Sequence, residues 1–186
     1  MNSSALAVLQ REQQLHDERA HLDILGLSPE RRITHMALHF AKYTGRLIEM
    51  QVIDWRALER VIVDATIICL ASANTLNMRL EHRIEGGALG TLDALLETYK
   101  DRHPSTLEAL PMWMGAQMAV HNAKIAKACE AFDHAEQYPY EQVLTMGVVE
   151  LLDVCLAAAG AMSLDLTNAI RTRWAGVEKK LQQRAA

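Results

Sequence analysis

The sequence has few cysteines, and their spacing excludes two classes of small protein. Cys69, Cys129 and Cys155 are the only three in 186 residues. An odd number of cysteines without a close pair forms neither a disulfide framework nor a zinc ribbon. Each of the three lies in an apolar stretch, where a thiol usually packs as a small hydrophobic side chain. We therefore expect a hydrophobic core, with the cysteines inside it, to stabilise the fold.

Aromatic side chains are also scarce, at 5% of the residues, although half of the chain is apolar. Ala, Leu, Ile, Val and Met supply most of the hydrophobic content, which favours helix packing over a β-sandwich. No stretch alternates apolar and polar residues between turn signals, as a strand would. The composition therefore predicts an all-α helical bundle in a single domain.

The chain has no excess of basic residues, and its sequence predicts no secretory segment. Its formal net charge of −4 argues against nucleic-acid binding, which usually needs a basic face. The longest apolar runs, at 61–80 and 148–164, contain the acids Asp64, Glu150 and Asp153, which are costly in lipid. We expect a cytoplasmic protein with neither a membrane nor a nucleic acid as partner.

Capping residues and helix breakers divide the chain into seven predicted helices. Ser28-Pro29-Glu30 combines a cap, a first-turn proline and a first-turn acid, and Asp54 caps the following helix. Gly86-Gly87 is part of the clearest break. The predicted helices span about 4–25, 29–50, 54–84, 91–101, 112–136, 140–162 and 164–183.

Two segments of the chain recur in the same order. Residues 36–42 align with 118–124 at an offset of 82, with five of seven positions identical. Residues 63–84 align with 149–170 at an offset of 86, which implies a four-residue insertion in the second copy. Two ungapped matches in register indicate a duplicated helical unit.

A duplicated helix pair has a structural consequence. One pair alone does not bury its apolar stripe, so two copies are expected to form a four-helix core. The predicted divisions are an N-terminal helix at 1–27, a first repeat at 28–85, a connector with a short helix at 86–111 and a second repeat at 112–186.

The clearest acidic pair is Glu150 and Asp153, which lie three residues apart on one predicted helix face. Their neighbours are apolar, and buried carboxylates need a cation or hydrogen-bond donors. A Mg²⁺ ion would meet this need, as would a Lys or Arg from another helix. In the first copy Asp64 aligns with Glu150, and Ile67 takes the place of Asp153.

The partner helix of each acidic helix carries mostly basic residues. These side chains would either neutralise the acids across the bundle or bind the phosphates of a nucleotide. They are Lys42, Arg46 and Glu49 in the first copy, and Lys124, Lys127 and Glu130 in the second.

Two histidine patterns suggest metal ligands, but each is incomplete. His35 and His39 have the i, i+4 spacing of a zinc pair without an evident third ligand. Glu18 and His21 form an isolated Glu-x-x-His without the second copy that a di-iron bundle would need. We interpret the histidine pair as structural.

The acidic helix resembles a known family. The run from Glu150 to Ala159, Glu-Leu-Leu-Asp followed by a Leu-Ala-rich stretch, resembles the MazG-like all-α NTP pyrophosphohydrolases. Residues 163–170 resemble the start of the family's next helix. In the first copy, residues 63–74 look similar, with Asn74 at the position of a family asparagine.

The resemblance implies Mg²⁺-dependent hydrolysis of an NTP or dNTP to a monophosphate and pyrophosphate. Glu150 and Asp153 would hold the ion, with Glu130 as a further ligand or a base for water. The residues implied for nucleotide binding are Lys124, Lys127, Lys42, Arg46 and Asn74. The family often forms homodimers, whereas an internal duplication would allow a monomer.

The first copy departs from the family pattern. Residues 42–49 stand where the family has an acid-rich segment, and only Glu49 is acidic there. Three alternatives stay open: a hydrolase, a nucleotide-binding relative without catalysis, and a structural helical protein whose charged N-terminal helix docks a partner.

Overall fold

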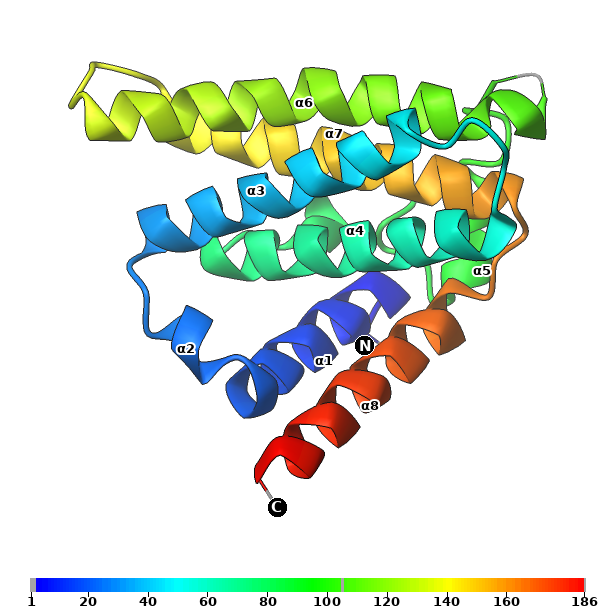
Figure 1. The fold of residues 1–186 in the computed structure, drawn as a ribbon, viewed down its shortest axis with the longest axis horizontal. Coiled ribbons are helices and arrows are strands. Elements are labelled where there is room, and N and C mark those ends of the chain that lie inside the picture. The colour runs from blue at the N-terminus through cyan, green and yellow to red at the C-terminus, as the bar shows by residue number, and fades with distance from the viewer. Residues whose placement is uncertain (1–2, 105, 186) are drawn as a thin grey trace.

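The computed structural model describes residues 3–104 and 106–185, and within them all regular structure is helical (Figure 1). The prediction of an all-α bundle is confirmed. The α-helices and two short 3₁₀ helices are α1 (Ala5–Ala20), α2 (Leu22–Leu25), α3 (Pro29–Ile48), α4 (Trp55–Thr75), η1 (Leu80–His82), α5 (Leu92–Glu97), η2 (Leu107–Ala109), α6 (Leu110–Asp133), α7 (Tyr140–Ala161) and α8 (Leu166–Ala185).

Four long helices form the centre of the bundle. Helices α3 and α4 contact each other, as do α6 and α7, and the two pairs join through contacts of α3 with α6 and α4 with α7. Side chains such as Phe40, Leu70, Met118 and Leu151 are fully buried there. The pairs thus pack as the sequence repeat predicted, each burying its apolar stripe against the other.

The remaining helices cover the core unequally. Helices α1 and α8 both contact α4 and lie beside each other, so one side of the first pair is covered (Figure 1). The shorter α5 contacts α7. Helix α4 therefore packs against helices from both ends of the chain.

The predicted helix starts in the first pair are correct. The Ser28 hydroxyl accepts a hydrogen bond from the Arg31 amide, and Pro29 opens α3. The Asp54 carboxylate accepts from the amides of Arg56 and Ala57 at 3.0 and 3.1 Å. These caps satisfy amides that a helix start leaves unpaired.

Several predicted boundaries are wrong. The short helix predicted to reach residue 101 ends at Glu97. The first helix ends at Ala20, because His21 leaves helical geometry before α2 begins. Helix α4 ends at Thr75 instead of residue 84, since Asn77 adopts a left-handed φ of 51° and the Met78 amide turns back to the Ala73 carbonyl at 2.8 Å. Pro111 lies in the first turn of α6, where a proline is tolerated.

Helix α7 is the one described helix with the length and apolar composition of a membrane span. Most of its apolar window, 61%, is buried inside the bundle. This burial is what a core helix of a folded domain shows, in keeping with the interpretation of the 148–164 run.

Candidate functional site

Glu150 on α7 is neutralised by the helix next to it. Its Oε2 accepts a hydrogen bond from Lys124 Nζ at 2.8 Å and lies 2.8 Å from His121 Nδ1, both on α6. Burial raises the pKa of this carboxyl, but the bonds from Lys124 and His121 outweigh it and leave the pKa below its usual value. The acid is therefore charged and already paired.

Asp153 has a different partner. Its Oδ1 accepts a hydrogen bond from the Tyr99 hydroxyl at 2.6 Å, just beyond the end of α5. Burial raises the pKa of Asp153, and the bond from Tyr99 offsets only part of that rise. Although Glu150 and Asp153 are three residues apart on α7, their carboxylates reach different elements.

Glu130 lies away from both acids. It is six residues beyond Lys124 on α6, which corresponds to about 9 Å along the helix axis. Its carboxylate is exposed and pairs with Lys127, whose Nζ also contacts Glu136 at 3.2 Å.

The predicted three-carboxylate magnesium site is therefore not assembled in this arrangement. Among the described residues, Glu130, Glu150 and Asp153 do not bring three ligand atoms within coordinating distance of one another. Mg²⁺ needs several oxygens in near-ideal octahedral geometry. Because two of the acids already have other partners and the third lies apart, the set does not fit one shared ion.

The residues predicted to bind a nucleotide are dispersed. Lys124 and Lys127 bind carboxylates, and Asn74 exchanges hydrogen bonds with Gln10, accepting from its Nε2 at 3.0 Å and donating to its carbonyl at 3.1 Å. The Asn74 amide thus fastens α1 to α4.

Lys42 and Arg46 on α3 have separate environments. Lys42 Nζ lies 4.7 Å from the centre of the Tyr43 ring and 3.1 Å from His39 Nδ1. Arg46 lines a pocket of about 360 Å³ that also includes Glu49. The two side chains therefore form no common phosphate site with the lysines of α6.

The His35–His39 pair lies on α3 with its Nε2 atoms 3.2 Å apart. His39 Nδ1 is 3.1 Å from the Tyr43 hydroxyl. Burial, together with the nearby charge of Lys42, lowers the pKa of His39 to about 4. A neutral, hydrogen-bonded ring agrees with a structural role.

Asp64, the first-copy counterpart of Glu150, is bound from α8. Its carboxylate accepts from Arg173 Nε at 2.6 Å and from the second guanidinium nitrogen at 3.3 Å. The Asp64 side chain is only 10% exposed, and that of Arg173 is 39% exposed. This two-point contact fixes α8 against α4.

A groove with a volume of about 620 Å³ lies beside this ion pair, between α4 and α8. Four basic and two acidic side chains line it, together with apolar and neutral polar groups. The lining residues are Arg56, Glu59, Arg60, Val63, Leu164, Asp165, Asn168, Ala169, Thr172, Arg173, Gly176 and Lys180. We call this site the α4–α8 groove.

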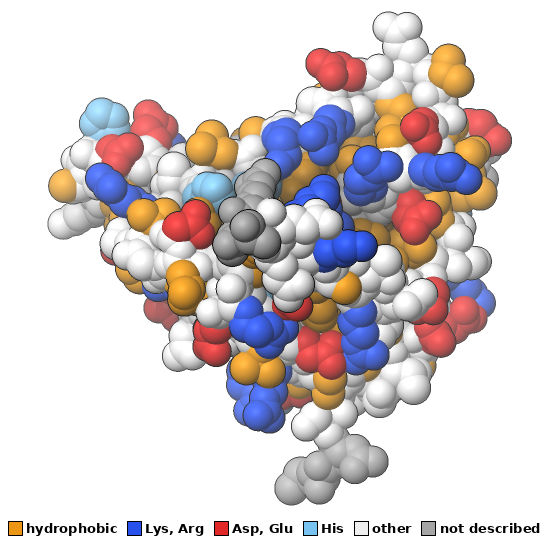
Figure 2. All heavy atoms as spheres, turned by 60° about the horizontal axis from the view of Figure 1, so that its bottom comes forward, with side chains coloured by type: hydrophobic (Ala, Val, Ile, Leu, Met, Phe, Trp, Pro, Cys, Tyr) orange, Lys and Arg blue, Asp and Glu red, His pale blue; other side chains and the backbone are white. Residues whose placement is uncertain are grey.

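The surface view agrees with a local concentration of positive charge. On the face that Figure 2 shows, Lys and Arg side chains gather around a patch of hydrophobic side chains. This site was not predicted from the sequence, although a signal existed: Arg56 and Arg60 are four residues apart on one helix face. What the spacing did not reveal is that α8 packs beside them.

Comparison with known proteins adds no assignment. No protein-family model, no curated protein and no solved structure matches the chain.

Proposed function

We propose that this protein binds a phosphate-bearing ligand of the nucleotide class in the α4–α8 groove, without hydrolysing it through the carboxylates of α6 and α7. The observation that carries the proposal is the charge of the groove. Its lining has twice as many basic as acidic side chains, in a protein whose formal net charge is −4. A concave site with locally positive charge attracts anions.

Arg56 and Arg60 are the side chains best suited to a phosphate. Within the described residues, neither guanidinium has a hydrogen-bond or ion-pair partner, whereas Arg173 is held by Asp64. A guanidinium binds two phosphate oxygens at once through parallel N–H donors. The two arginines are therefore open to a ligand, and the fixed Arg173 adds charge behind them.

The rest of the lining suits the uncharged part of a nucleotide. Val63, Leu164 and Ala169 offer apolar surface, and Asn168 and Thr172 offer neutral polar groups. The groove volume of about 620 Å³ lies in the range of small-molecule sites. A base or sugar against the apolar surface, with phosphates at the arginines, would use both kinds of side chain.

Mg²⁺-dependent hydrolysis stays a prediction that rests on the resemblance of residues 150–159. The paired state of Glu150 and the separate position of Glu130 favour binding over hydrolysis. No catalytic step is assigned to these acids.

The test is calorimetric titration of the tag-free protein with ATP and, separately, with inorganic pyrophosphate, at low salt and with EDTA. We expect binding that weakens as salt is added. Arg60→Ala should weaken it about 10- to 100-fold, as the loss of a charged hydrogen bond does.

Arg171→Ala is the matched control. It also removes one arginine, in this case from α8. Because Arg171 pairs with Glu12 outside the groove, ligand binding should be unchanged. Equal losses in the two variants, or no binding at low salt, would contradict the proposal. Pyrophosphate release from ATP that needs Mg²⁺ and disappears in Glu150→Gln would support the hydrolase instead.

A further inference from the structure

Three potential metal ligands converge where α1 ends. One ligand atom each from His16, Asp17 and His21 lies within 4.8 Å of the other two. His16 and Asp17 are 2% and 8% exposed, and His21 is partly buried. The sequence pattern had drawn attention to Glu18 with His21, so this combination was not predicted.

The break after α1 explains how the histidines meet. On a continuous helix, residues five apart point about 140° away from each other. His21 instead has φ −136° and ψ 42°, outside helical geometry, while its amide still donates to the Asp17 carbonyl at 2.9 Å. The rings of His16 and His21 lie with their centroids 5.4 Å apart. The break thus serves to bring two imidazoles to one place.

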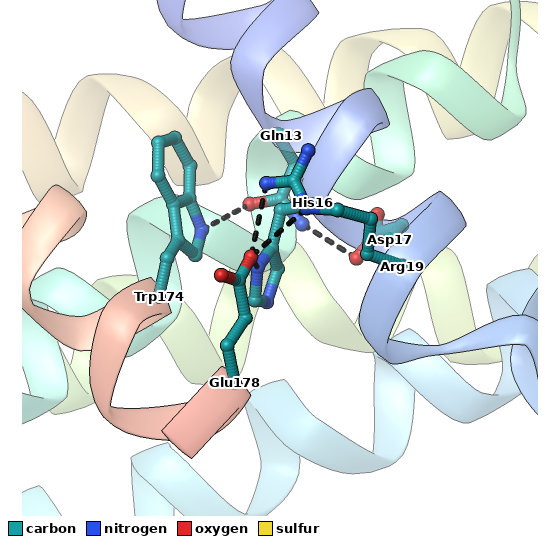
Figure 3. Close-up of polar contacts among 6 residues, drawn as sticks. All are labelled: Gln13, His16, Asp17, Arg19, Trp174 and Glu178. Carbon is teal, nitrogen blue, oxygen red and sulfur yellow. Dashed lines mark hydrogen bonds and ion pairs between the residues drawn. The ribbon is translucent and has the colours of Figure 1, made fainter. Parts of the chain in front are cut away.

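Glu178 on α8 orients the His16 ring (Figure 3). Its Oε1 lies 3.1 Å from His16 Nδ1 and also accepts from Arg19 at 2.9 Å. The bonds from Arg19 and His16 lower the pKa of Glu178. A charged carboxylate on Nδ1 favours the tautomer with its proton there, which leaves the lone pair of Nε2 for a ligand. This carboxylate–histidine arrangement is common behind metal sites.

Asp17 is a buried acid that no lysine or arginine of the described residues neutralises. Within the described residues, its carboxylate forms no ion pair with Lys or Arg, and its Oδ1 accepts one hydrogen bond, from Gln13 Nε2 at 2.7 Å. Gln13 is held in turn by the Trp174 indole N–H at 2.8 Å (Figure 3). Burial raises the pKa of Asp17. A buried carboxylate is costly unless a cation or more donors compensate it.

We propose that His16, Asp17 and His21 bind one divalent transition-metal ion of the zinc type, and that the ion secures the end of α1 against α8 through Glu178. Two imidazoles and a carboxylate are common zinc ligands, with a water completing four-coordination. Mg²⁺ prefers oxygen ligands alone, so this set discriminates against it. The site is independent of the α4–α8 groove, which other residues of α8 line.

The test starts with tag-free protein stripped by a chelator and titrated with Zn²⁺ alone. We expect one ion bound per chain in calorimetry. At a free concentration about 100 times Kd, Zn²⁺ should raise Tm by roughly 5–10 °C. Mg²⁺ at the same concentration should leave Tm unchanged. Co²⁺ should give visible absorption bands that report on nitrogen and oxygen coordination.

Variants decide whether the ion binds at this cluster. His21→Ala and the isosteric Asp17→Asn should abolish the Zn²⁺ effect while circular dichroism shows an intact helical fold. Glu178→Gln should lower zinc affinity about 10- to 100-fold, as the loss of an orienting carboxylate does. His35→Gln is the control, because it removes half of the other histidine pair, and it should bind as the parent does.

Two results would overturn the proposal. One is the absence of specific Zn²⁺ binding by the parent protein. The other is binding that survives both His21→Ala and Asp17→Asn; its disappearance in His35→Gln would then place the ion on α3.

Discussion

The two helix pairs solve the same electrostatic problem in different ways. Each has an acid at the aligned position, Asp64 on α4 and Glu150 on α7. Glu150 is paired within its own unit, by His121 and Lys124 of α6. Asp64 is paired by Arg173, which comes from α8, beyond the aligned segment 149–170. The first pair therefore depends on the C-terminal helix, and the groove lies where that helix joins it.

The aligned basic residues show the same divergence. Lys124 reaches Glu150, but its counterpart Lys42 lies beside His39 and the Tyr43 ring. Once α8 supplies an arginine to the acid of the first pair, the lysine of α3 is not needed there. The aligned positions thus resemble each other more closely in residue type than in contacts.

The largest expected effect tests which acid depends more on its partner. Arg173→Met removes the ion-pair partner of the mostly buried Asp64. This should lower the free energy of unfolding by about 3 kcal/mol, near the low end for buried pairs because Arg173 is partly exposed. Lys124→Met leaves Glu150 beside His121 and should cost less than about 1 kcal/mol. Urea denaturation of both variants measures the difference; equal losses would contradict the comparison.

Acid should destabilise the first pair through His39. Its pKa of about 4 in the fold lies below the ordinary 6.5, so the unfolded chain binds the proton first as pH falls. Stability should therefore decrease between about pH 6.5 and pH 4, by roughly 2–3 kcal/mol. Denaturation of the parent and of His39→Gln at pH 7, 5 and 4 measures this. Identical pH profiles would exclude His39 as the cause.

The close helix packing of the second pair should make it sensitive to an added methyl group. A Cβ at Gly147 would meet Ile125 Cγ1 at 2.7 Å, whereas the residue at the same offset in α4 is Val61. Gly147→Ala should therefore destabilise the protein by about 1–3 kcal/mol. The control, Gly176→Ala, meets nothing within 4 Å and should stabilise α8 by roughly 0.5–1 kcal/mol. Thermal unfolding would show opposite shifts; shifts of one sign would contradict this packing.

The smallest effects separate the two acids of α7. Glu150 has a lowered pKa, so its charge stabilises the fold at pH 7 and this contribution is lost as pH falls through the folded pKa. Glu150→Gln should thus be less stable than the parent at pH 7. Asp153 has a raised pKa, so Asp153→Asn should be more stable at pH 7, by an amount that shrinks in acid. If both substitutions changed the free energy of unfolding at pH 7 in the same direction, the opposite pKa shifts of Glu150 and Asp153 would be refuted.

Local sequence signals predicted much of the fold. Ser28-Pro29 and Asp54 marked helix starts correctly, because caps depend on adjacent residues. The end of α4 was not predicted, because it depends on the left-handed φ of Asn77. Asparagine tolerates this conformation but does not require it, so its presence alone does not mark a helix end. The apolar run at 61–80 extends past Thr75, where the helix ends.

The site was less predictable than the fold. The spacing of Glu150 and Asp153 was read correctly as one helix face, but spacing does not reveal that Tyr99 and Lys124 approach from different sides. The α4–α8 groove requires knowledge of where the last helix packs, and Arg173 gave no such signal. The partners of these acids and the position of the groove depend on where the helices pack in the tertiary structure, which local sequence does not specify.

The most direct test of the account is to locate a phosphate ligand on the protein by NMR. Inorganic pyrophosphate would be added to ¹⁵N-labelled protein in EDTA, and amide shifts would be followed. The account predicts that the changes centre on Arg56, Arg60, Asn168 and Gly176 of the groove. The titration would then be repeated with Mg²⁺ in place of EDTA. Shifts that centre on Glu150 and Asp153, and appear only in this second titration, would contradict the account.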